Sequence, residues 1–266
     1  MVANTPVPGA PAPVAFAPGA PGPVVAVVDY HKGNLSSVER GLASVGARVL
    51  VTDDPRAIAG CDAAVVPGVG AFEDASSYMR ESGQAEAVLS LVSRGRPVLG
   101  ICLGMQLLFD RGDESSAALA GGCCGSFDGA ASCDPVPRDP AFSHEPGHVW
   151  TPGLALMAGD VVRISAEGVK VPHVGWNSVE LTPQAAACPL FAGVGSGAYY
   201  YFTHSYVCVP ASPRVVVGET EHGARFASAV WDGGCVFGTQ FHPEKSSDAG
   251  QALLANFVSF VKGGGR

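Results

Sequence analysis

The sequence predicts an α/β fold with a mainly parallel central sheet, and three observations support this prediction. Short apolar runs alternate with segments of helical periodicity through the first half of the chain, an order that implies parallel strands joined by right-handed crossovers. VVAVVDY at residues 24–30 is a continuous apolar run, which is typical of a strand buried on both faces. The 266 residues, 47% of them apolar, suffice to bury the core of one such domain.

The other expected elements follow in order. The first helix is predicted over residues 33–46, where apolar side chains recur at helical spacing. Further strands are predicted at residues 47–52, 61–68 and 96–102. Further helices are predicted at residues 85–95, 103–110 and 251–263. In the second half, β-branched and aromatic runs predict strands that extend or flank the sheet, at residues 159–164, 177–181, 198–209, 214–220, 225–232 and 235–241.

Composition and charge exclude several classes of function. The formal net charge is −8 and Lys/Arg clusters are absent, which argues against nucleic-acid binding because phosphate contacts need a basic face. The apolar runs are shorter than the roughly 18–20 residues of a membrane helix, and the N-terminus lacks the pattern of a secretory signal. We therefore expect a cytoplasmic protein that binds no membrane, with its eight cysteines as free thiols.

Two segments fall outside the predicted core, which is expected to form one domain over residues 24–262. Residues 1–23 are rich in Pro, Ala and Gly, which predicts a disordered tail. Residues 112–152 have no sustained period, which predicts a flexible surface insertion. The insertion contains possible zinc ligands, although it lacks a C-x2-C pair and incidental cysteines are the simpler interpretation. These residues are Cys123, Cys124, Cys133, His144 and His148.

The segment VLGICLGMQLL places a cysteine at the junction of a predicted strand and a predicted helix. Cys102 has glycines two positions before and after it, Gly100 and Gly104, as a sharp strand-to-helix turn requires. A thiol at a helix start is close to the helix dipole and to free N–H groups, which stabilise a thiolate and can hold an oxyanion. On its own, this pattern could equally belong to a buried core cysteine.

Two further segments favour a catalytic cysteine. In FGTQFHPEKSS, His242 follows a predicted strand and is two residues from Glu244. An imidazole can take the thiol proton and give it to a leaving amine, and a carboxylate can fix its tautomer. In VVPGVGAFEDA, the loop from Pro67 to Gly70 can aim backbone N–H groups at a carbonyl oxygen. Each segment taken alone could be a plain turn, and the loop lacks the Lys-Ser/Thr of a phosphate loop.

With these segments in view, the sequence resembles the class I, triad-type glutamine amidotransferases, on GICLGMQ at 100–106 and QFHPE at 240–244. Within that family it is similar to the glutaminase subunits of imidazole glycerol phosphate synthase. The segments that carry this similarity are YHKGNLS at 30–36, PGVGAFEDA at 67–75, KVPHVGWNSV at 170–179 and FTHSYV at 202–207. The resemblance covers roughly residues 24–111 and 153–262. It implies a flavodoxin-like three-layer fold, with a mixed, mainly parallel central sheet and helices on both faces.

The resemblance also implies roles for individual residues. Cys102 would form a glutamyl thioester, His242 would act as base and then as acid, and Glu244 would orient the histidine. Backbone N–H groups of Leu103 and of the loop at Val69 and Gly70 would form the oxyanion hole. The glutamine pocket would be lined by Gly70, Gln106, Thr203, His204, Ser205 and Tyr206. No cofactor is implied, and neither His173 nor His204 is expected to bind a metal.

The family members that the chain resembles hydrolyse glutamine to glutamate and ammonia. They pass the ammonia to a cyclase partner, a (β/α)8 barrel that makes imidazole glycerol phosphate and the purine precursor AICAR in histidine biosynthesis. The resemblance therefore implies a heterodimer, with partner contacts at Tyr30, Asn34, Pro172, His173, Trp176 and Lys245. It implies no role for the tail or the insertion, because the relatives lack both.

Two alternatives are left open by the sequence. One is an amidotransferase of the same fold that supplies another synthase, such as one for pyridoxal phosphate or anthranilate, although those relatives lack the HVGWN segment at 173–177. The other is a non-catalytic scaffold that only binds a partner, although all three triad residue types are present.

Overall fold

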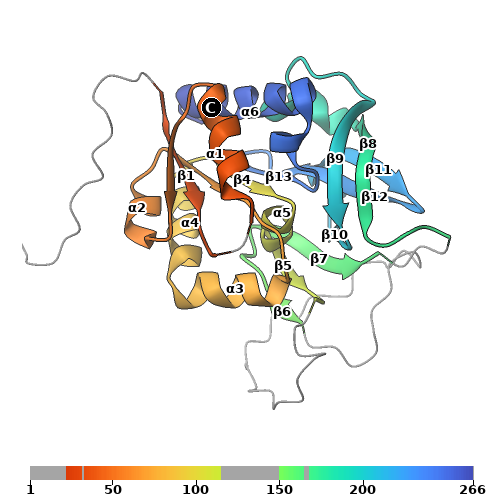
Figure 1. Cartoon of the computed structure of the whole chain (residues 1–266), viewed down its shortest axis with the longest axis horizontal. Helices are drawn as coiled ribbons and strands as arrows, with labels where there is room; N and C mark the ends of the chain where they lie inside the picture. Colours follow the sequence, from red (N-terminus) through yellow and green to blue (C-terminus); the bar gives the residue numbers. More distant parts are fainter. Residues whose placement is uncertain (1–21, 32, 115–149, 165–167, 266) are drawn as a thin grey trace, which may run out of the picture.

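The computed structural model describes residues 22–31, 33–114, 150–164 and 168–265, in which a mixed sheet carries helices on both faces (Figure 1). The helices are α1 (Leu35–Ser44), α2 (Pro55–Ala59), α3 (Phe72–Glu81), α4 (Gln84–Ser93), α5 (Leu103–Leu107) and α6 (Ser247–Lys262). The first strands are β1 (Val24–Val28), β2 (Arg48–Thr52), β3 (Ala63–Val66), β4 (Val98–Ile101), β5 (Phe109–Gly112), β6 (Thr151–Pro152) and β7 (Met157–Arg163). The later strands are β8 (His173–Leu181), β9 (Ala198–His204), β10 (Tyr206–Pro210), β11 (Val216–His222), β12 (Ala224–Trp231) and β13 (Val236–Thr239). Short 3₁₀ segments are η2 (Pro183–Ala187), η3 (Pro189–Phe191), η4 (Pro213–Val215) and η5 (Pro243–Lys245).

The strands follow the order β2-β1-β3-β4-β13-β12-β10-β7-β5-β6, and β11 connects β12 to the β8–β9 hairpin. From β2 to β13 all neighbours are parallel. Beyond β13 the pairs are antiparallel, except for β5 beside β7. The predicted three-layer α/β fold with a mixed sheet is confirmed, and its parallel strands β3, β4 and β13 meet where the predicted nucleophile lies.

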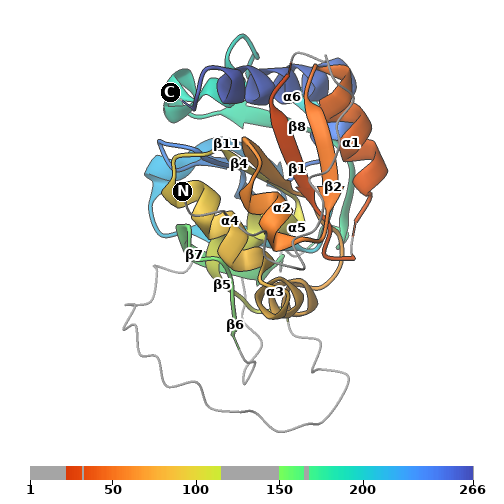
Figure 2. The same ribbon diagram turned by 90° about the vertical axis from the view of Figure 1, so that its left-hand side faces the viewer.

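Two apolar clusters, one on each face of the sheet, form the core. Along β1, Val25 and Val27 belong to the cluster under α1 and α6, whereas Ala26 and Val28 belong to the cluster under α2, α3 and α4. This alternation follows from the two-residue period of a strand, and it explains why buried parallel strands are apolar throughout. Figure 2 shows β1 and β2 between α1 on one side and α2 and α4 on the other.

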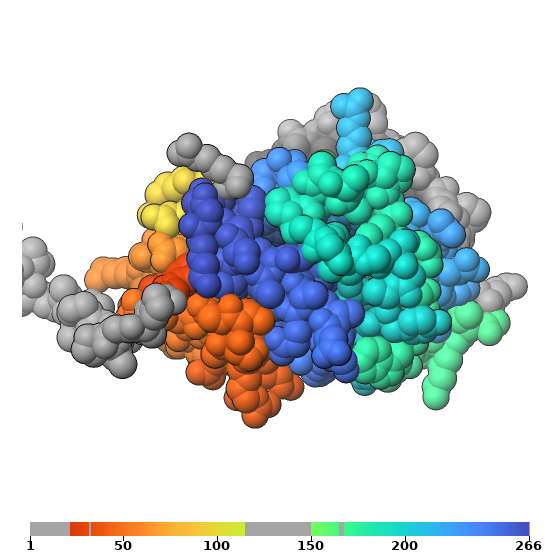
Figure 3. All heavy atoms as spheres, turned by 90° about the horizontal axis from the view of Figure 1, so that it is seen from above, coloured from red at the N-terminus to blue at the C-terminus, as the bar shows by residue number. Residues whose placement is uncertain are grey.

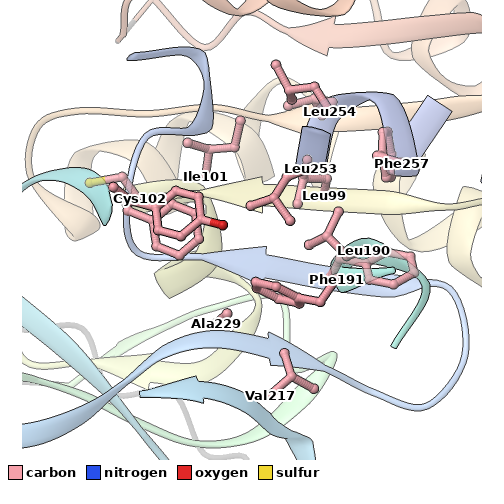
Figure 4. Close-up of a cluster of buried hydrophobic side chains, with 14 of the residues drawn as sticks. Leu99, Ile101, Cys102, Leu190, Phe191, Val217, Ala229, Leu253, Leu254 and Phe257 are labelled. Atoms are coloured by element: carbon pink, nitrogen blue, oxygen red, sulfur yellow. The ribbon is translucent and has the colours of Figure 1, made fainter. Parts of the chain in front are cut away.

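Helix α6 closes one face of the molecule. It lies between α1 and the segment that carries η2 and η3 (Figure 3). Its apolar face buries Leu253, Leu254 and Phe257 in the same cluster as Leu99 and Ile101 of β4 (Figure 4). Burial of each side chain of this size contributes about 1.5–3 kcal/mol to stability. This packing holds α6 against the sheet, and the turn that precedes α6 is held with it.

The structure differs from the predicted elements in several places. The helix predicted over 103–110 ends at Leu107, because Phe109 pairs with β7 and tertiary pairing overrides local helical periodicity. The strand predicted over 198–209 is divided into β9 and β10 at Ser205. Helix α2 was not predicted; the Asp54 carboxylate caps its start by accepting from the backbone N–H of Arg56 at 2.9 Å. Both ends of the segment at 112–152 pair with each other as β5 and β6.

Several predictions concern residues outside the described part of the chain. They include most of the predicted tail and the possible zinc ligands of the insertion, namely Cys123, Cys124, Cys133, His144 and His148. Among the described helices, none is long and apolar enough to cross a membrane.

Gly104 gives a direct test of the packing at the start of α5. A side chain there would overlap the carbonyl oxygen of Val66 on β3, and backbone atoms cannot move away as a flexible side chain can. We expect Gly104→Ala to lower the free energy of unfolding by about 3 kcal/mol or to prevent folding. Chemical unfolding checks this, with Gly195→Ala as control because a Cβ at Gly195 meets no atom within 4 Å. Equal stability of the two variants would contradict the packing described here.

Candidate active site

Cys102 lies at the sharp turn between β4 and α5. Its φ of 55° and ψ of −109° are unusual for a residue with a side chain, and such a backbone costs about 1–3 kcal/mol unless its surroundings hold it. A hydrogen bond of 2.7 Å from its N–H to the carbonyl of Thr239 on β13 helps to hold it. A Cβ at Gly100 would lie 2.5 Å from the carbonyl oxygen of Gly104, so the turn closes only with glycine there. The predicted nucleophile elbow is therefore present, although α5 has only 5 residues and its dipole is smaller than expected.

The turn that carries His242 and Glu244 is fixed on two sides. The N–H of His242 donates to the carbonyl of Tyr201 on β9 at 2.9 Å, and the Ser246 hydroxyl donates to the carbonyl of His242 at 2.6 Å. A side chain at Gly250 of α6 would overlap the carbonyl of Pro243, so α6 lies directly against η5. The side chains of His242 and Glu244 are thus presented by a rigid backbone.

His242 and Glu244 form a buried imidazole–carboxylate pair. Nδ1 of His242 and Oε1 of Glu244 are 2.9 Å apart, and the two side chains are 4% and 1% exposed. Burial lowers the pKa of His242, but interactions with Cys102 and Glu244 outweigh it and raise this pKa to about 9. The ring is therefore close enough to the sulfur for the two groups to affect each other's charge. Nε2 itself has no hydrogen bond of ordinary geometry, which leaves it available for a proton.

A pocket of about 270 Å³ opens beside the Cys102 sulfur. Its lining includes every residue predicted for the glutamine pocket and the oxyanion hole, namely Val69, Gly70, Leu103, Gln106, Thr203, His204, Ser205 and Tyr206. Leu103 is the first residue of α5, so its N–H is not used within the helix and can donate to a ligand. Three segments far apart in the sequence thus meet at one thiol.

Tyr30 supports the loop that was predicted to form the oxyanion hole. Its ring is 1% exposed and its hydroxyl donates to the carbonyl of Pro67. Burial raises the pKa of Tyr30, so the phenol keeps its proton and donates. A side chain at Gly68 would overlap this hydroxyl, which explains the glycine at that position. The prediction that Tyr30 contacts a partner is therefore wrong for its side chain, which is buried under the loop.

Comparison with known proteins agrees with this geometry. The family model described as glutamine amidotransferase class-I matches residues 26–260. This chain belongs to the class I glutamine amidotransferases. It is 39% identical over 241 residues to the imidazole glycerol phosphate synthase subunit HisH of Moorella thermoacetica, covering 91% of this chain and 97% of that protein. The corresponding subunit of Syntrophotalea carbinolica is 38% identical over 234 residues, covering 88% of this chain and 98% of that protein.

Solved structures show the same fold. A crystal structure described as a glutamine amidotransferase superimposes with a TM-score of 0.59 at 18% identity, covering 90% of this chain and 98% of that chain. The two chains therefore share a fold although few of their residues are identical.

The residues predicted to face a partner fall into two groups in the structure, those with accessible side chains and those with buried side chains. Asn34, Pro172 and Trp176 are exposed and Lys245 is half-buried, so their side chains are accessible. His173 is only 4% exposed, because it packs between Phe202 and His222. The prediction that the His173 side chain contacts a partner is therefore wrong, for the same physical reason as for Tyr30.

His173 is part of a chain of hydrogen bonds behind the pocket wall. The carbonyl of Tyr206 accepts from Nδ1 of His204 at 2.8 Å, which leaves Nε2 of His204 to accept from Nδ1 of His173 at 3.0 Å. Nε2 of His173 then accepts from the Asn177 amide at 3.2 Å. Burial lowers the pKa of His173 to about 4 and that of His204 to about 3, so both rings are neutral.

Two residues of the site were missed in the sequence. Glu114 lines the pocket, and its carboxylate accepts from the N–H of Phe72 at 2.9 Å. It stands in a polar segment without periodicity, so no sequence pattern marked it. Gln240 belongs to the QFHPE motif but was given no role; its amide nitrogen lies 3.6 Å from the Cys102 sulfur. Only the pairing of β13 with β4 shows that it stands beside Cys102.

The lowered pKa values of His173 and His204 predict that mild acid destabilises the protein. Unfolded histidines take up protons near pH 6.5, whereas the folded rings do so only near their pKa values of about 4 and about 3. Stability should therefore fall as pH decreases from about 7 to about 5.5, and His204→Gln should reduce this dependence. Urea unfolding at several pH values measures it, with the exposed His31→Gln as control. The raised pKa of His242 acts in the opposite direction, so the comparison with His204→Gln decides: an equal pH dependence of the two proteins would contradict the neutral chain.

Proposed function

We propose that this chain is the glutaminase subunit of an imidazole glycerol phosphate synthase and hydrolyses L-glutamine to glutamate and ammonia. The observation that carries the proposal is the buried His242–Glu244 pair, which interacts with Cys102, while Cys102 also lines a pocket of about 270 Å³. The 39% and 38% identical HisH subunits support the choice of synthase within the family. A pocket that held only a structural cysteine would need neither the buried ion pair nor the strained turn.

The first half of the reaction forms a thioester. The proton of the Cys102 thiol moves to Nε2 of His242, and the sulfur attacks the side-chain amide carbon of glutamine. The carbonyl oxygen becomes an oxyanion, which the backbone N–H of Leu103 and the loop at Val69 and Gly70 stabilise. His242 then gives its proton to the leaving nitrogen, so that ammonia departs and the glutamyl group stays on sulfur. Glu244 holds the imidazolium through Nδ1 while it carries the charge.

The second half releases glutamate. A water molecule gives a proton to Nε2 of His242 as its oxygen attacks the thioester carbon. When the tetrahedral intermediate collapses, the C–S bond breaks and the sulfur regains a proton from His242. The product leaves as the γ-carboxylic acid, which loses its proton to solvent to give glutamate, and the enzyme returns to its starting protonation state.

Glu114 is placed to recognise the substrate as an amino acid. Its carboxyl group lies at the same pocket as Cys102, and the N–H of Phe72 fixes one of its oxygens. A carboxylate at this position attracts the α-ammonium group of glutamine. Burial raises the pKa of Glu114, the hydrogen bond from Phe72 opposes this, and a bound ammonium group would lower it further.

The β8–β9 hairpin supports a docking face for the cyclase subunit. Val174, Trp176 and Tyr199 are 57%, 51% and 61% exposed, and the strand register places them on one side of the hairpin. An exposed apolar group of this kind is typical of an interaction surface. The same side carries Thr203, which lines the pocket, so a partner bound here would lie next to the source of ammonia.

Cys102→Ala in the complex with the cyclase subunit tests the proposal. Glutamine-dependent formation of imidazole glycerol phosphate should fall by about 10³-fold or more, because no nucleophile remains. Activity with added ammonium salt should stay within about twofold of wild type, because the partner carries out that step. Cys188→Ala, which removes another buried thiol, is the matched control. Glutamine-driven turnover by Cys102→Ala would show that the mechanism is wrong.

Glu114→Gln tests the recognition of the substrate amine. We expect KM for glutamine to rise by about 10- to 100-fold with kcat changed far less, because the lost ion pair acts on binding rather than on the reacting bond. Steady-state glutaminase kinetics of the reconstituted complex measure both constants. Glu180→Gln, a carboxylate outside the pocket, serves as control. A fall in kcat at constant KM would instead place Glu114 in the chemical step.

A further inference from the structure

Gln240 stands beside the nucleophile because of the pairing of two parallel strands. Thr239, the last residue of β13, pairs with Ile101, the last residue of β4, so the residues that follow, Gln240 and Cys102, are neighbours. Gln240 is 0% exposed and its N–H donates to the carbonyl of Ser228 at 2.9 Å. A fully buried amide beside a reactive sulfur must find partners for its polar atoms within the site.

The hydrogen bonds around Gln240 determine which end of its amide faces the sulfur. Nε2 of Gln106 lies 3.0 Å from the carbonyl oxygen of Tyr206, which can only accept, so Gln106 presents its NH₂ group there. The same nitrogen lies 3.1 Å from Oε1 of Gln240 and donates its second hydrogen to it. Nε2 of Gln240 therefore points to the Cys102 sulfur, 3.6 Å away. The carbonyl of Tyr206 thus fixes the orientation of the Gln106 amide, and Gln106 in turn fixes that of the Gln240 amide.

The sulfur needs such a donor once its proton has left. As a thiol, Cys102 donates to the carbonyl oxygen of Thr203 at 3.7 Å. After the proton has moved to His242, that oxygen faces a negative sulfur and repels it. The helix that follows has only 5 residues, so its dipole gives limited compensation. An N–H donor fixed at Gln240 offsets the repulsion.

We propose that Gln240 is a catalytic residue whose amide N–H donates a hydrogen bond to the negative sulfur of Cys102, with Gln106 as the positioning residue that fixes the orientation of this amide. The inference rests on the proposed glutaminase function for its role in turnover. The same hydrogen bond acts twice in the reaction, because the negative sulfur is present before attack on glutamine and forms again when the thioester breaks.

Two variants separate the donor from the shape of the side chain. Gln240→Met keeps a similar length but removes the donor, and Gln240→Glu keeps an oxygen for Gln106 but turns the donor into an acceptor. We expect alkylation of Cys102 by iodoacetamide in the isolated chain to slow by about 10- to 100-fold in both, as for a lost hydrogen bond to a charged group. Peptide mass spectrometry measures the rate at Cys102 itself. In the cyclase complex, kcat should fall by a similar factor while KM for glutamine changes by less than about threefold.

Gln84→Met is the matched control. Gln84 is also 0% exposed, and its amide donates to the carbonyls of Asp29 and Asp53 at 2.8 and 3.1 Å, away from the sulfur. It should share any loss of stability with Gln240→Met but leave the alkylation rate of Cys102 unchanged. Wild-type alkylation rates in both Gln240 variants would overturn the inference. A third outcome separates the two proposals. If both Gln240 variants are alkylated more slowly but the wild-type complex does not hydrolyse glutamine, the hydrogen bond is supported and the proposed function is contradicted.

A second measurement leaves Gln240 unchanged, so it applies even if the Gln240 variants do not fold. In protein labelled with ¹⁵N at glutamine side chains, the NH₂ signals of Gln240 should shift between wild type and Cys102→Ala, and also on alkylation of Cys102. The NH₂ signals of Gln84 should stay in place in the same spectra. Gln240 signals that do not move in either comparison would overturn the inference.

Discussion

The backbone turn at Cys102 is the constraint on which the rest of the site depends. A residue with a side chain is held there at φ 55°, between the end of β4 and the start of α5. The surroundings compensate for this strain by close backbone packing, since neither Gly100 nor Gly104 has room for a Cβ. As a result, the thiol belongs to the apolar cluster drawn in Figure 4 and also lines the pocket.

The His242–Glu244 pair is also held rigidly, by hydrogen bonds and by the packing of α6. His242 and Glu244 follow β13 on a single 3₁₀ turn, and β9, Ser246 and α6 each fix part of its backbone. Burial of an imidazole normally lowers its pKa, yet the carboxylate and the sulfur reverse that effect here. The pair is thus poised to carry a charge that the protein interior would otherwise disfavour.

Neutral polar side chains form two hydrogen-bond networks near the charged groups of the site. The chain from Asn177 through His173 and His204 to Tyr206 has a defined tautomer at each ring, since it ends at a backbone carbonyl. The Gln106 and Gln240 amides are ordered from the same carbonyl of Tyr206. The carbonyl of Tyr206, the first residue of β10, therefore accepts from both networks and links the position of the sulfur to this strand.

Periodicity, glycine spacing and short motifs are local properties, so the α/β order, the turn at Cys102 and the residue types of the triad could be predicted from the sequence. The residues that the family resemblance assigned to the glutamine pocket line one pocket beside Cys102. Four features became apparent only from the fold: the burial of Tyr30 and His173, the end of α5 at Leu107, and the places of Glu114 and of Gln240 beside Cys102. These features depend on strand pairing and burial between segments far apart in the chain, which no local pattern of residues records.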